Sequence, residues 1–294
     1  MQASILIVTK NRKEELEITL KVLAKQIDLS VHEVLVFLDG CTDDTISLKS
    51  TIPWVKWFSS EKSIGASAAR NSLYLNAEGV FFIGLDDDAH PLNEDFVFKI
   101  ETLFSKYPSV GILAFEEIKG IYLSDLHALK QTESKKKEYL SSEFIGCGFA
   151  IRKSVYNETN GFPVWVDIYG EESCLSIEVL ARGYDILYSN EIKVNHRVDR
   201  EQRKANKQNY FRFGKQLKNS TYYFLVYYPY PLISILKLYW HNFKKYALSD
   251  FEYFKIYFKT IFIVLIHIPK ILKYRNPVDE NVIAKIKKTS ILKY

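Results

Sequence analysis

At residues 80–91 the sequence reads Val80-Phe81-Phe82-Ile83-Gly84-Leu85-Asp86-Asp87-Asp88-Ala89-His90-Pro91, an apolar run that ends in three consecutive carboxylates. An apolar run of this length is typical of a strand that is buried on both faces. Carboxylates at its carboxyl end would project into the crevice where open α/β sheets bind their ligands. Three adjacent acids repel one another, so they favour a cation such as Mg²⁺ or Mn²⁺ together with a diphosphate. A solvated acidic turn that caps the next helix is an equally good interpretation of this stretch alone.

The sequence before this stretch alternates between strand-like and helix-like segments. We predict strands at residues 4–9, 32–38 and 54–58, and helices at 13–26 and from Gly65 to about 77. Such alternation predicts an α/β fold with a parallel sheet and right-handed crossovers.

The sequence after this stretch is less regular. We predict a helix at residues 172–182 that Gly183 ends, a basic helix at 197–217, and helices in 219–236 and 251–272, the first of which two prolines break. Residues 119–142 are polar and charged, which indicates a mobile loop or insertion. Further strands are predicted at 110–115, 144–151, 184–188 and 192–196.

Composition limits the class of protein. The 294 residues are 47% hydrophobic and 26% charged, which is typical of globular proteins. Three cysteines without metal-type spacing suggest a reducing compartment, and the first residues resemble no secretory leader. We therefore expect a cytoplasmic protein.

Charge is distributed unevenly along the chain. Residues 197–294 have a formal net charge of +14, whereas residues 1–196 have a net charge of −9. This asymmetry predicts an acidic α/β domain at residues 1–200 and a basic, aromatic-rich helical C-terminal region at residues 201–294.

Polar residues follow the predicted strands in a particular order. The segments are Thr9-Lys10-Asn11-Arg12, Asp39-Gly40-Cys41-Thr42-Asp43-Asp44-Thr45, Ala68-Ala69-Arg70-Asn71 after Gly65, Asp86-Asp87-Asp88, Tyr169-Gly170-Glu171-Glu172 and Glu191-Ile192-Lys193-Val194-Asn195-His196. As an ordered set over about residues 4–200, they resemble the family 2 glycosyltransferases, which are inverting enzymes with the GT-A nucleotide-diphospho-sugar transferase fold.

The resemblance implies a nucleotide-sugar donor and assigns residues to it. Thr9 and Asn11 would lie near the base, with Arg12 close by. Asp39 matches an acid that reads the base edge, and its carboxylate can accept the imide N–H of uracil or thymine. The donor would then be a UDP- or dTDP-sugar. Arg70 would pair with Asp39 or with phosphate through its planar guanidinium.

The resemblance also implies a divalent metal. Asp88 would ligate it directly, and Asp86 would lie near the ribose or a metal-bound water, with Asp87 also on the donor side. His196 matches a histidine that often supplies a further ligand. Mn²⁺ or Mg²⁺ would neutralise charge on the departing diphosphate, and an imidazole ligand slightly favours Mn²⁺.

The general base is implied by the pair Glu171-Glu172. In the family the second acid of the pair usually deprotonates the acceptor hydroxyl, and adjacent carboxylates raise the pKa of one of them. Position 172 is Glu where Asp is commoner, and Cys174 stands where the family often has Asp. The base therefore stays open between the two glutamates. Residues 146–148 and Trp165 are candidates for contact with the acceptor sugar.

The basic C-terminal region has two candidate partners. It contains no recognisable nucleic-acid-reading element, so we expect no nucleic acid. Residues 222–228 and 251–272 combine aromatic residues with flanking lysines, as interfacial membrane segments do. We expect peripheral contact with the cytoplasmic face of the cell membrane, near a lipid-linked acceptor. Packing of these helices on the α/β body or on a second subunit is the alternative.

These features together predict a function. We expect a metal-dependent inverting glycosyltransferase that moves a hexose-type sugar from a UDP- or dTDP-sugar to a glycan hydroxyl in surface polysaccharide assembly. A sugar nucleotidyltransferase is one alternative, but it needs a glycine-rich phosphate loop after the first strand, which residues 9–12 do not provide. A non-catalytic nucleotide-sugar or membrane-binding protein is the other, and the acids at 86–88 and 171–172 argue against it.

Overall fold

The computed structural model describes residues 2–132, 135–199, 208–290 and 292. Its strands are β1 (Ala3–Thr9), β2 (His32–Asp39), β3 (Lys56–Ser60), β4 (Phe81–Asp86), β5 (Ala89–Pro91), β6 (Val110–Lys119), β7 (Glu138–Ser141), β8 (Gly148–Arg152) and β9 (Asp185–His196). Its α-helices are α1 (Lys13–Gln26), α2 (Leu48–Thr51), α3 (Ala66–Leu75), α4 (Phe96–Lys106), α5 (Asp125–Leu129), α6 (Lys153–Asn157), α7 (Glu171–Ala181), α9 (Gln208–Tyr227), α10 (Pro231–Asn242), α11 (Phe251–Ile271) and α12 (Glu280–Lys288).

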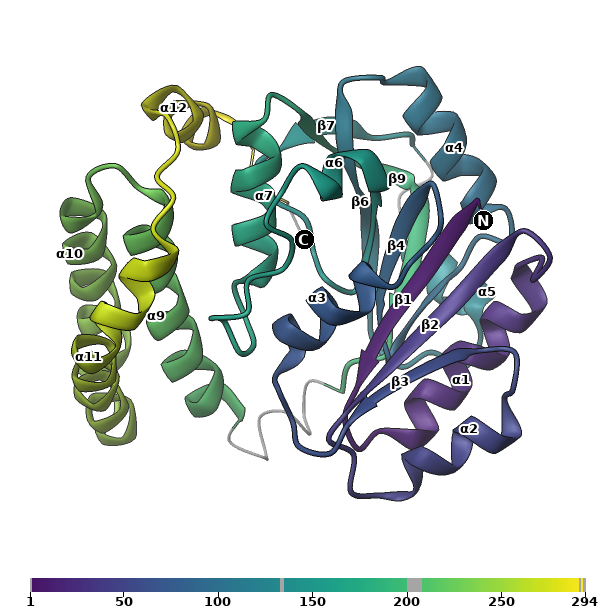
Figure 1. Ribbon diagram of the computed structural model, residues 1–294, viewed down its shortest axis with the longest axis horizontal. Coiled ribbons are helices and arrows are strands. Elements are labelled where there is room, and N and C mark those ends of the chain that lie inside the picture. Colours follow the sequence, from purple (N-terminus) through teal and green to yellow (C-terminus); the bar gives the residue numbers. More distant parts are fainter. Residues whose placement is uncertain (1, 133–134, 200–207, 291, 293–294) are drawn as a thin grey trace.

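The strands form one mixed sheet with the order β3-β2-β1-β4-β8-β6-β9-β5, and β7 pairs with β9. The first four strands in this order are parallel, whereas β8 runs antiparallel to both β4 and β6. Helices cover both faces of the sheet (Figure 1). The predicted α/β class is confirmed.

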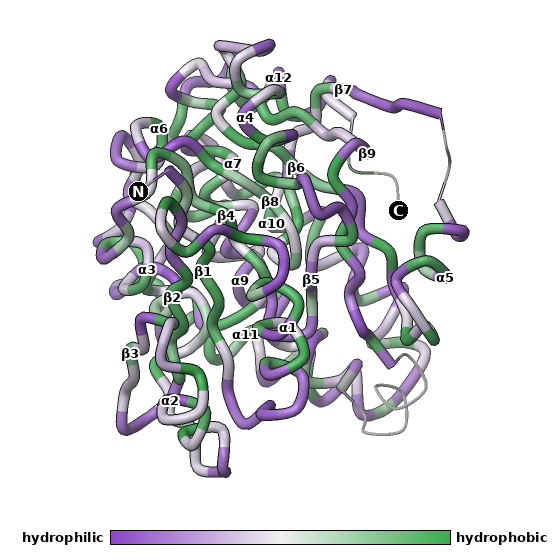
Figure 2. Tube along the Cα trace, turned by 90° about the vertical axis from the view of Figure 1, so that its right-hand side faces the viewer, coloured by the Kyte–Doolittle hydropathy of each residue, from purple (hydrophilic) through white to green (hydrophobic). Residues whose placement is uncertain are grey.

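The central strands are buried on both faces, as the apolar run predicted. Along β1, Ile5 and Ile7 pack in the core layer that includes residues of α1 and α4, whereas Leu6 packs in the layer that includes residues of α3 and α7. In β4, Ile83 packs in the layer with α1 and α4, and Phe82 packs in the layer with α3 and α7. Figure 2 shows hydrophobic residues concentrated along β1 and β2. Burying each such side chain contributes about 1.5–3 kcal/mol.

The register of the parallel strands places the polar segments at one edge. Thr9 pairs with Leu38 next to Asp39, and Asp86 pairs with Val8. Because these strands are parallel, the residues at their carboxyl ends meet where α/β sheets bind ligands.

Some predicted elements are wrong in their bounds. Strand β3 begins two residues later than predicted because residues 52–55 form a turn, closed by Val55 N–H on the Ile52 carbonyl. The two strands predicted at 184–188 and 192–196 are the single strand β9. Residues 119–142, predicted as a mobile loop or insertion, contain α5 and β7.

Two further differences concern the start of β8 and the start of the C-terminal helices. Strand β8 begins at Gly148, because residues 145–148 form a turn in which Gly148 N–H donates to the Ile145 carbonyl. Much of the helix predicted at 197–217 falls on residues 200–207, which lie outside the described residues, and α9 begins at Gln208.

The C-terminal helices pack on the α/β body, which was one form of the alternative to peripheral membrane contact. In Figure 1, α7 lies between the sheet and helices α9, α10 and α11. Cys174 and Ile177 of α7 share a core cluster with Tyr222 and Val226 of α9. Among the helices that the structure describes, none is long and apolar enough to cross a membrane.

Candidate active site

The three acids at the end of β4 and just after it each make a close contact with a different residue. Arg70 donates to Asp86 at 2.6 Å. Asp87 is 6% exposed and accepts from Thr9 Oγ1 at 2.7 Å. Asp88 is 2% exposed and lies 2.7 Å from Arg12 Nη2. The acidic run is therefore not a solvated turn.

The neighbouring carboxyls Asp87 and Asp88 are both buried, but their pKa values shift in opposite directions because their charged partners differ. Burial raises the pKa of Asp87 to about 7, and the charge of Arg12 only partly opposes this. Burial also disfavours ionised Asp88, but His196 and Arg12 outweigh it and hold the pKa of Asp88 well below its ordinary value.

Asp86, Asp88 and His196 form a group that fits a divalent metal. Their ligand atoms all lie within 4.8 Å of one another. Carboxylate oxygen and imidazole nitrogen are ligand types that Mn²⁺ accepts. His196 Nε2 lies 3.2 Å from Asp88 Oδ1, and Nδ1 lies 2.5 Å from Glu117 Oε1. A carboxylate on the second ring nitrogen is the usual device that orients a metal-binding histidine.

The structure brings together the two halves of the predicted site through Arg70. Arg70 lies on α3, and the residue is 9% exposed. Besides Asp86, it contacts Glu172 Oε1 at 3.2 Å and Glu171 Oε1 at 3.5 Å. A single guanidinium thus joins the metal-ligand group to the predicted base.

Arg70 was predicted to pair with Asp39 or with phosphate, and the structure shows that Asp39 is not its partner. Its carboxylate accepts from Ser63 Oγ at 2.6 Å, from Ile64 N–H at 2.7 Å and from Gly65 N–H at 3.2 Å. Asp39 therefore fixes the loop that leads into α3, and it reaches Arg70 only through that helix.

Glu171 and Glu172 begin α7 but differ in exposure. Glu171 is 3% exposed, and its Oε2 has no hydrogen-bond partner among the described residues. Burial, and then the charge of Glu172, raise the pKa of Glu171 above its ordinary value. The side chain of Glu172 is 23% exposed. Of the two, Glu172 is therefore the more exposed carboxylate.

Asn11 and Arg12 lie in the loop after β1. Asn11 has a positive φ of 55° and exchanges two hydrogen bonds with Thr42, at 2.7 and 3.0 Å. This pair joins the loops after β1 and β2. The Arg12 side chain is 40% exposed and contacts both Asp87 and Asp88.

The sequence did not single out two residues that support the site. Glu117 on β6 binds His196, and Arg197 binds the Asp87 carbonyl at 3.3 Å together with Glu15 at 2.7 Å. The acidic pair Glu116-Glu117, directly after the apolar run at 110–115, was the available signal for Glu117. Arg197 adjoins His196 in sequence.

The predicted acceptor-side residues take separate places. Gly146 lies against the acids, since a Cβ built there would be 2.3 Å from Glu172 Oε1 and 2.8 Å from Arg70. Trp165 packs with the aromatic rings of Tyr222, Tyr227 and Tyr274 from the C-terminal region.

The chain is similar to several solved structures at the level of the fold. It is 17% identical to TarS residues 1–349 of S. aureus, with a TM-score of 0.54 over 67% of this chain and 60% of that one. It is 17% identical to GalNAc-T7, whose structure holds UDP, GalNAc and Mn²⁺, with a TM-score of 0.60 over 80% of this chain and 49% of that one. It thus spans about half to three fifths of the length of these two chains.

A third similar structure extends over nearly the whole chain. This is the mannosyltransferase PcManGT of Pyrobaculum calidifontis in complex with GDP-Man and Mn²⁺. Its identity is 15% and its TM-score is 0.58, over 99% of this chain and 76% of that one. No curated protein matches the chain at a significant level.

The family comparison is more specific than the fold. The model of "Glycosyl transferase family 2" matches residues 4–159, which is more than half of the chain. The mixed α/β sheet agrees with the GT-A glycosyltransferases among the similar structures. The predicted family and fold are thus confirmed, and the chain belongs to glycosyl transferase family 2.

Proposed function

We propose that this protein transfers a hexose-type sugar from a UDP- or dTDP-sugar to a glycan hydroxyl, with inversion and with Mn²⁺ or Mg²⁺. The observation that carries this proposal is the position of Arg70, which contacts Asp86 at 2.6 Å and Glu172 at 3.2 Å. The site for a departing diphosphate and a carboxylate that can accept a proton are thus neighbours. An in-line displacement needs the base and the leaving-group site on opposite sides of the anomeric carbon, and the Arg70 guanidinium between Asp86 and Glu172 supports such a division.

The metal would be held by Asp88 and His196, with Asp86 nearby. When bound, it would supply positive charge that stabilises the departing nucleoside diphosphate. Arg12 and Arg70 add fixed positive charge on either side of the same acids. Mn²⁺ is present in the structures of GalNAc-T7 and PcManGT, which supports a divalent ion here.

The base in this proposal is Glu172. The acceptor oxygen bonds to the anomeric carbon, the bond from that carbon to the diphosphate oxygen breaks, and the acceptor proton passes to the Glu172 carboxylate. Glu171 is buried and holds its proton to higher pH, so it is a poorer acceptor at neutral pH. Its place beside Arg70 fits a supporting role.

The nucleotide in this proposal is read by Asp39 with Thr9 and Asn11 nearby. Asp39 Oδ1 accepts one bond from Ile64 N–H, and a carboxylate oxygen can accept a second one, from a uracil or thymine imide. UDP complexes of TarS and GalNAc-T7 support a uridine nucleotide, whereas the GDP-Man complex of PcManGT is the alternative to exclude.

A donor panel followed by two variants tests this function. Nucleotide sugars are compared by thermal shift with Mn²⁺ and with EDTA, and a donor at 100 times its Kd should stabilise the fold by about 2.7 kcal/mol. Glu172→Gln should keep this stabilisation but lose about 10²–10⁴-fold in transfer rate. Glu171→Gln, its neighbour, should lose less. If no donor stabilises the protein, or if both variants transfer sugar at the full rate, the proposal is wrong.

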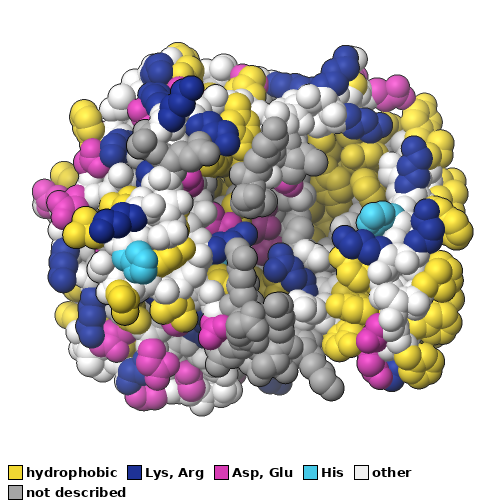
Figure 3. Space-filling view, turned by 180° about the vertical axis from the view of Figure 1, so that it is seen from behind, with side chains coloured by type: hydrophobic (Ala, Val, Ile, Leu, Met, Phe, Trp, Pro, Cys, Tyr) yellow, Lys and Arg dark blue, Asp and Glu magenta, His cyan; other side chains and the backbone are white. Residues whose placement is uncertain are grey.

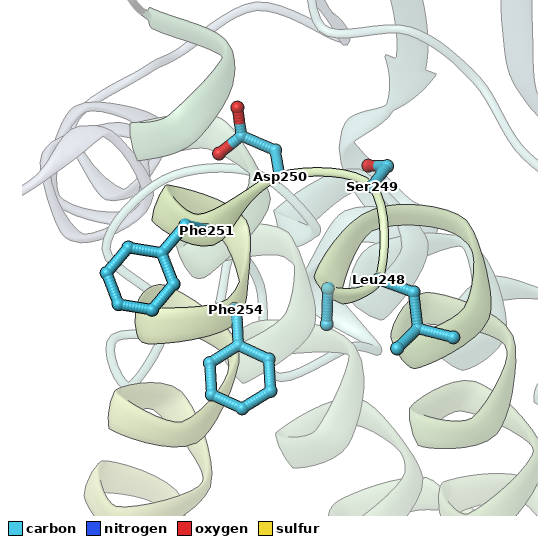
Figure 4. A pocket seen from close by; sticks show the side chains of 6 residues that line it. Leu248, Ser249, Asp250, Phe251 and Phe254 are labelled. Atoms are coloured by element: carbon cyan, nitrogen blue, oxygen red, sulfur yellow. The ribbon is translucent and has the colours of Figure 1, made fainter.

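The acceptor side of the proposal involves a membrane surface. Fourteen of the 28 exposed large hydrophobic residues among those described fall within residues 230–274. The same 45 residues contain seven lysines and two acids. Figure 3 shows these hydrophobic side chains along one edge of the molecule, with basic side chains among them. A pocket of about 350 Å³ in this region is lined by Ala247, Leu248, Ser249, Asp250, Phe251 and Phe254. Figure 4 shows the side chains that line it.

We propose that this edge lies on the anionic cytoplasmic face of the cell membrane, which would supply a lipid-linked acceptor for surface polysaccharide assembly. Each lysine near such a surface contributes about 1 kcal/mol, and the attraction weakens with salt. The protein should float with vesicles of anionic lipid at low salt and less with neutral ones. Trp240→Ser with Phe262→Ser should reduce flotation, whereas Phe98→Ser, equally exposed on α4, should not. A protein that stays in the soluble fraction with anionic vesicles would exclude this contact.

A further inference from the structure

Helix α9 lies against the segment that leads into the two glutamates. Asn219 of α9 is 1% exposed, and its Nδ2 donates to the backbone carbonyls of Ile168 at 2.7 Å and Tyr169 at 2.9 Å. These carbonyls belong to residues two and three positions before Glu171. A side chain from the C-terminal region thus holds backbone next to the site.

The held backbone has an unusual conformation. Tyr169 has a φ of +68°, and it is one of two non-glycine residues with positive φ among those described. Gly170 follows with a φ of +108°, and no side chain caps the N-terminus of α7. A left-handed conformation is unfavourable for a non-glycine residue and persists where its surroundings impose it. The carbonyl contacts of Asn219 are such a restraint.

Asp167 connects the same segment to two helices, α9 and α3. Its carboxylate contacts Lys215, and Lys218 Nζ lies 3.1 Å from it, both on α9. Its backbone carbonyl accepts from Ser67 N–H at 3.3 Å, in the first turn of α3. Arg70, which binds both glutamates, is on that helix. The segment is therefore fixed between the helix that carries Arg70 and α9.

The α9 residues that contact the segment form one stripe. Arg212, Lys215, Asn219 and Tyr222 are spaced by three or four positions, so they share a face of the helix. Arg212 lies over the ring of Tyr169 at 5.0 Å, and Tyr222 packs against Trp165. The stripe follows residues 165–169 along about half of the helix. Some of the basic residues of α9 therefore contact the α/β body and do not face solvent alone.

We infer that Asn219 is a positioning residue of the transferase site: through the Ile168 and Tyr169 carbonyls it fixes the turn that aims Glu171 and Glu172 at Arg70. Asp167, held by Lys215 and Lys218, supports the same turn. The inference rests on the proposed function for the catalytic role of the glutamates. The placement of the turn can be measured without turnover.

The test compares Asn219→Ala with Thr221→Val. Thr221 is 2% exposed on the same helix, but its hydroxyl contacts Leu217 and Tyr239 and not the segment. In Asn219→Ala, a displaced turn should lower kcat by up to about 10²-fold and leave the donor affinity in the presence of Mn²⁺ unchanged. Amide hydrogen exchange should rise at residues 168–172. Thr221→Val should change neither kcat nor this exchange. Asp167→Asn, which keeps the side-chain size, should show the Asn219→Ala pattern in weaker form.

Three results would overturn the inference. In the first, both α9 variants lose kcat in proportion to the drop in thermal stability, as a merely structural role predicts. In the second, Asn219→Ala shows wild-type exchange at residues 168–172. The third result applies if Asn219→Ala does not fold. In that case, hydrogen exchange at residues 168–172 that is the same in Asp167→Asn as in the wild type would overturn the inference. Absence of sugar transfer by the wild-type protein would instead contradict the proposed function, and the exchange data would still decide whether α9 fixes the turn.

Discussion

Replacing Asp87 with Asn should stabilise the protein above pH 7 and leave its stability almost unchanged below pH 4. Asp87 is buried at the end of β4 between Thr9 and Arg12. Asn has nearly the same shape, and its amide oxygen can keep the 2.7 Å bond from the Thr9 hydroxyl. Arg12 keeps its contact with Asp88 at 2.7 Å. The substitution therefore removes mainly the ionisation of one buried carboxyl.

The magnitude follows from the pKa of this carboxyl. Burial raises the pKa of Asp87 from 3.8 to about 7. Below about pH 4 the group is protonated in both the folded and the unfolded chain. Between 3.8 and about 7 the unfolded chain releases the proton and the folded protein keeps it, so the stability of the wild type falls as pH rises. Each unit of difference between the folded and unfolded pKa values corresponds to about 1.4 kcal/mol, so the free energy of unfolding of the wild type falls by up to about 4 kcal/mol.

Urea unfolding at pH 4, 5.5, 7 and 8 measures this difference. The free energy of unfolding of Asp87→Asn minus that of the wild type should grow across this range and level off above about pH 7. EDTA is present throughout, because a metal bound to the neighbouring acids would change the titration. Leu75→Ala, a substitution of an exposed α3 residue, serves as a control without a titrating group. A difference between Asp87→Asn and the wild type that is the same at pH 4 and pH 8 would refute the reasoning.

Three further substitutions separate stability from activity. Gly84→Ala should destabilise the fold by about 1–3 kcal/mol in urea unfolding, because its Cβ would meet a core aromatic ring at 2.1 Å. Gly146→Ala should change stability less, since its Cβ meets the flexible end of Glu172, but should reduce transfer by about 10²-fold; a large loss of stability there would contradict this. Glu117→Gln should weaken Mn²⁺ binding by about 10–100-fold, measured by calorimetry, because Glu117 orients His196; unchanged affinity would contradict this orienting role.

Local patterns predicted the elements whose bounds depend on nearby residues. Helix α1 has its predicted limits, since its buried Leu16, Leu20 and Leu23 repeat at helical spacing. Strand β9 was divided in the prediction because Ser189, Asn190 and Glu191 are polar. The Asn190 side chain is satisfied by the backbone of residues 135 and 137. That partner lies more than 50 positions away, so no local pattern could reveal it.

The candidate site shows the same limit. The order of the acids indicated which carboxylates belong to one site, and the structure does place Asp86, Asp88 and His196 together. The sequence could not indicate which charges pair. Arg70 was expected beside Asp39 or phosphate, yet it binds Glu172, which is 102 positions away. A contact between residues so far apart in the sequence depends on how α3 and α7 pack. The sequence alone does not show how close these two helices lie.

The predicted boundary at residue 200 is best tested by separating the two parts. The family model ends at residue 159, but the predicted base lies beyond it on α7, and α7 packs against α9. A chain of residues 1–200 would expose Cys174 and Ile177, which are now buried against Tyr222 and Val226. Loss of a few such contacts, each worth about 1.5–3 kcal/mol, is comparable with a total stability of about 5–15 kcal/mol. We therefore expect this fragment to aggregate or to melt well below the full chain. A soluble fragment that binds donor with full affinity would show that the charge boundary is also a folding boundary.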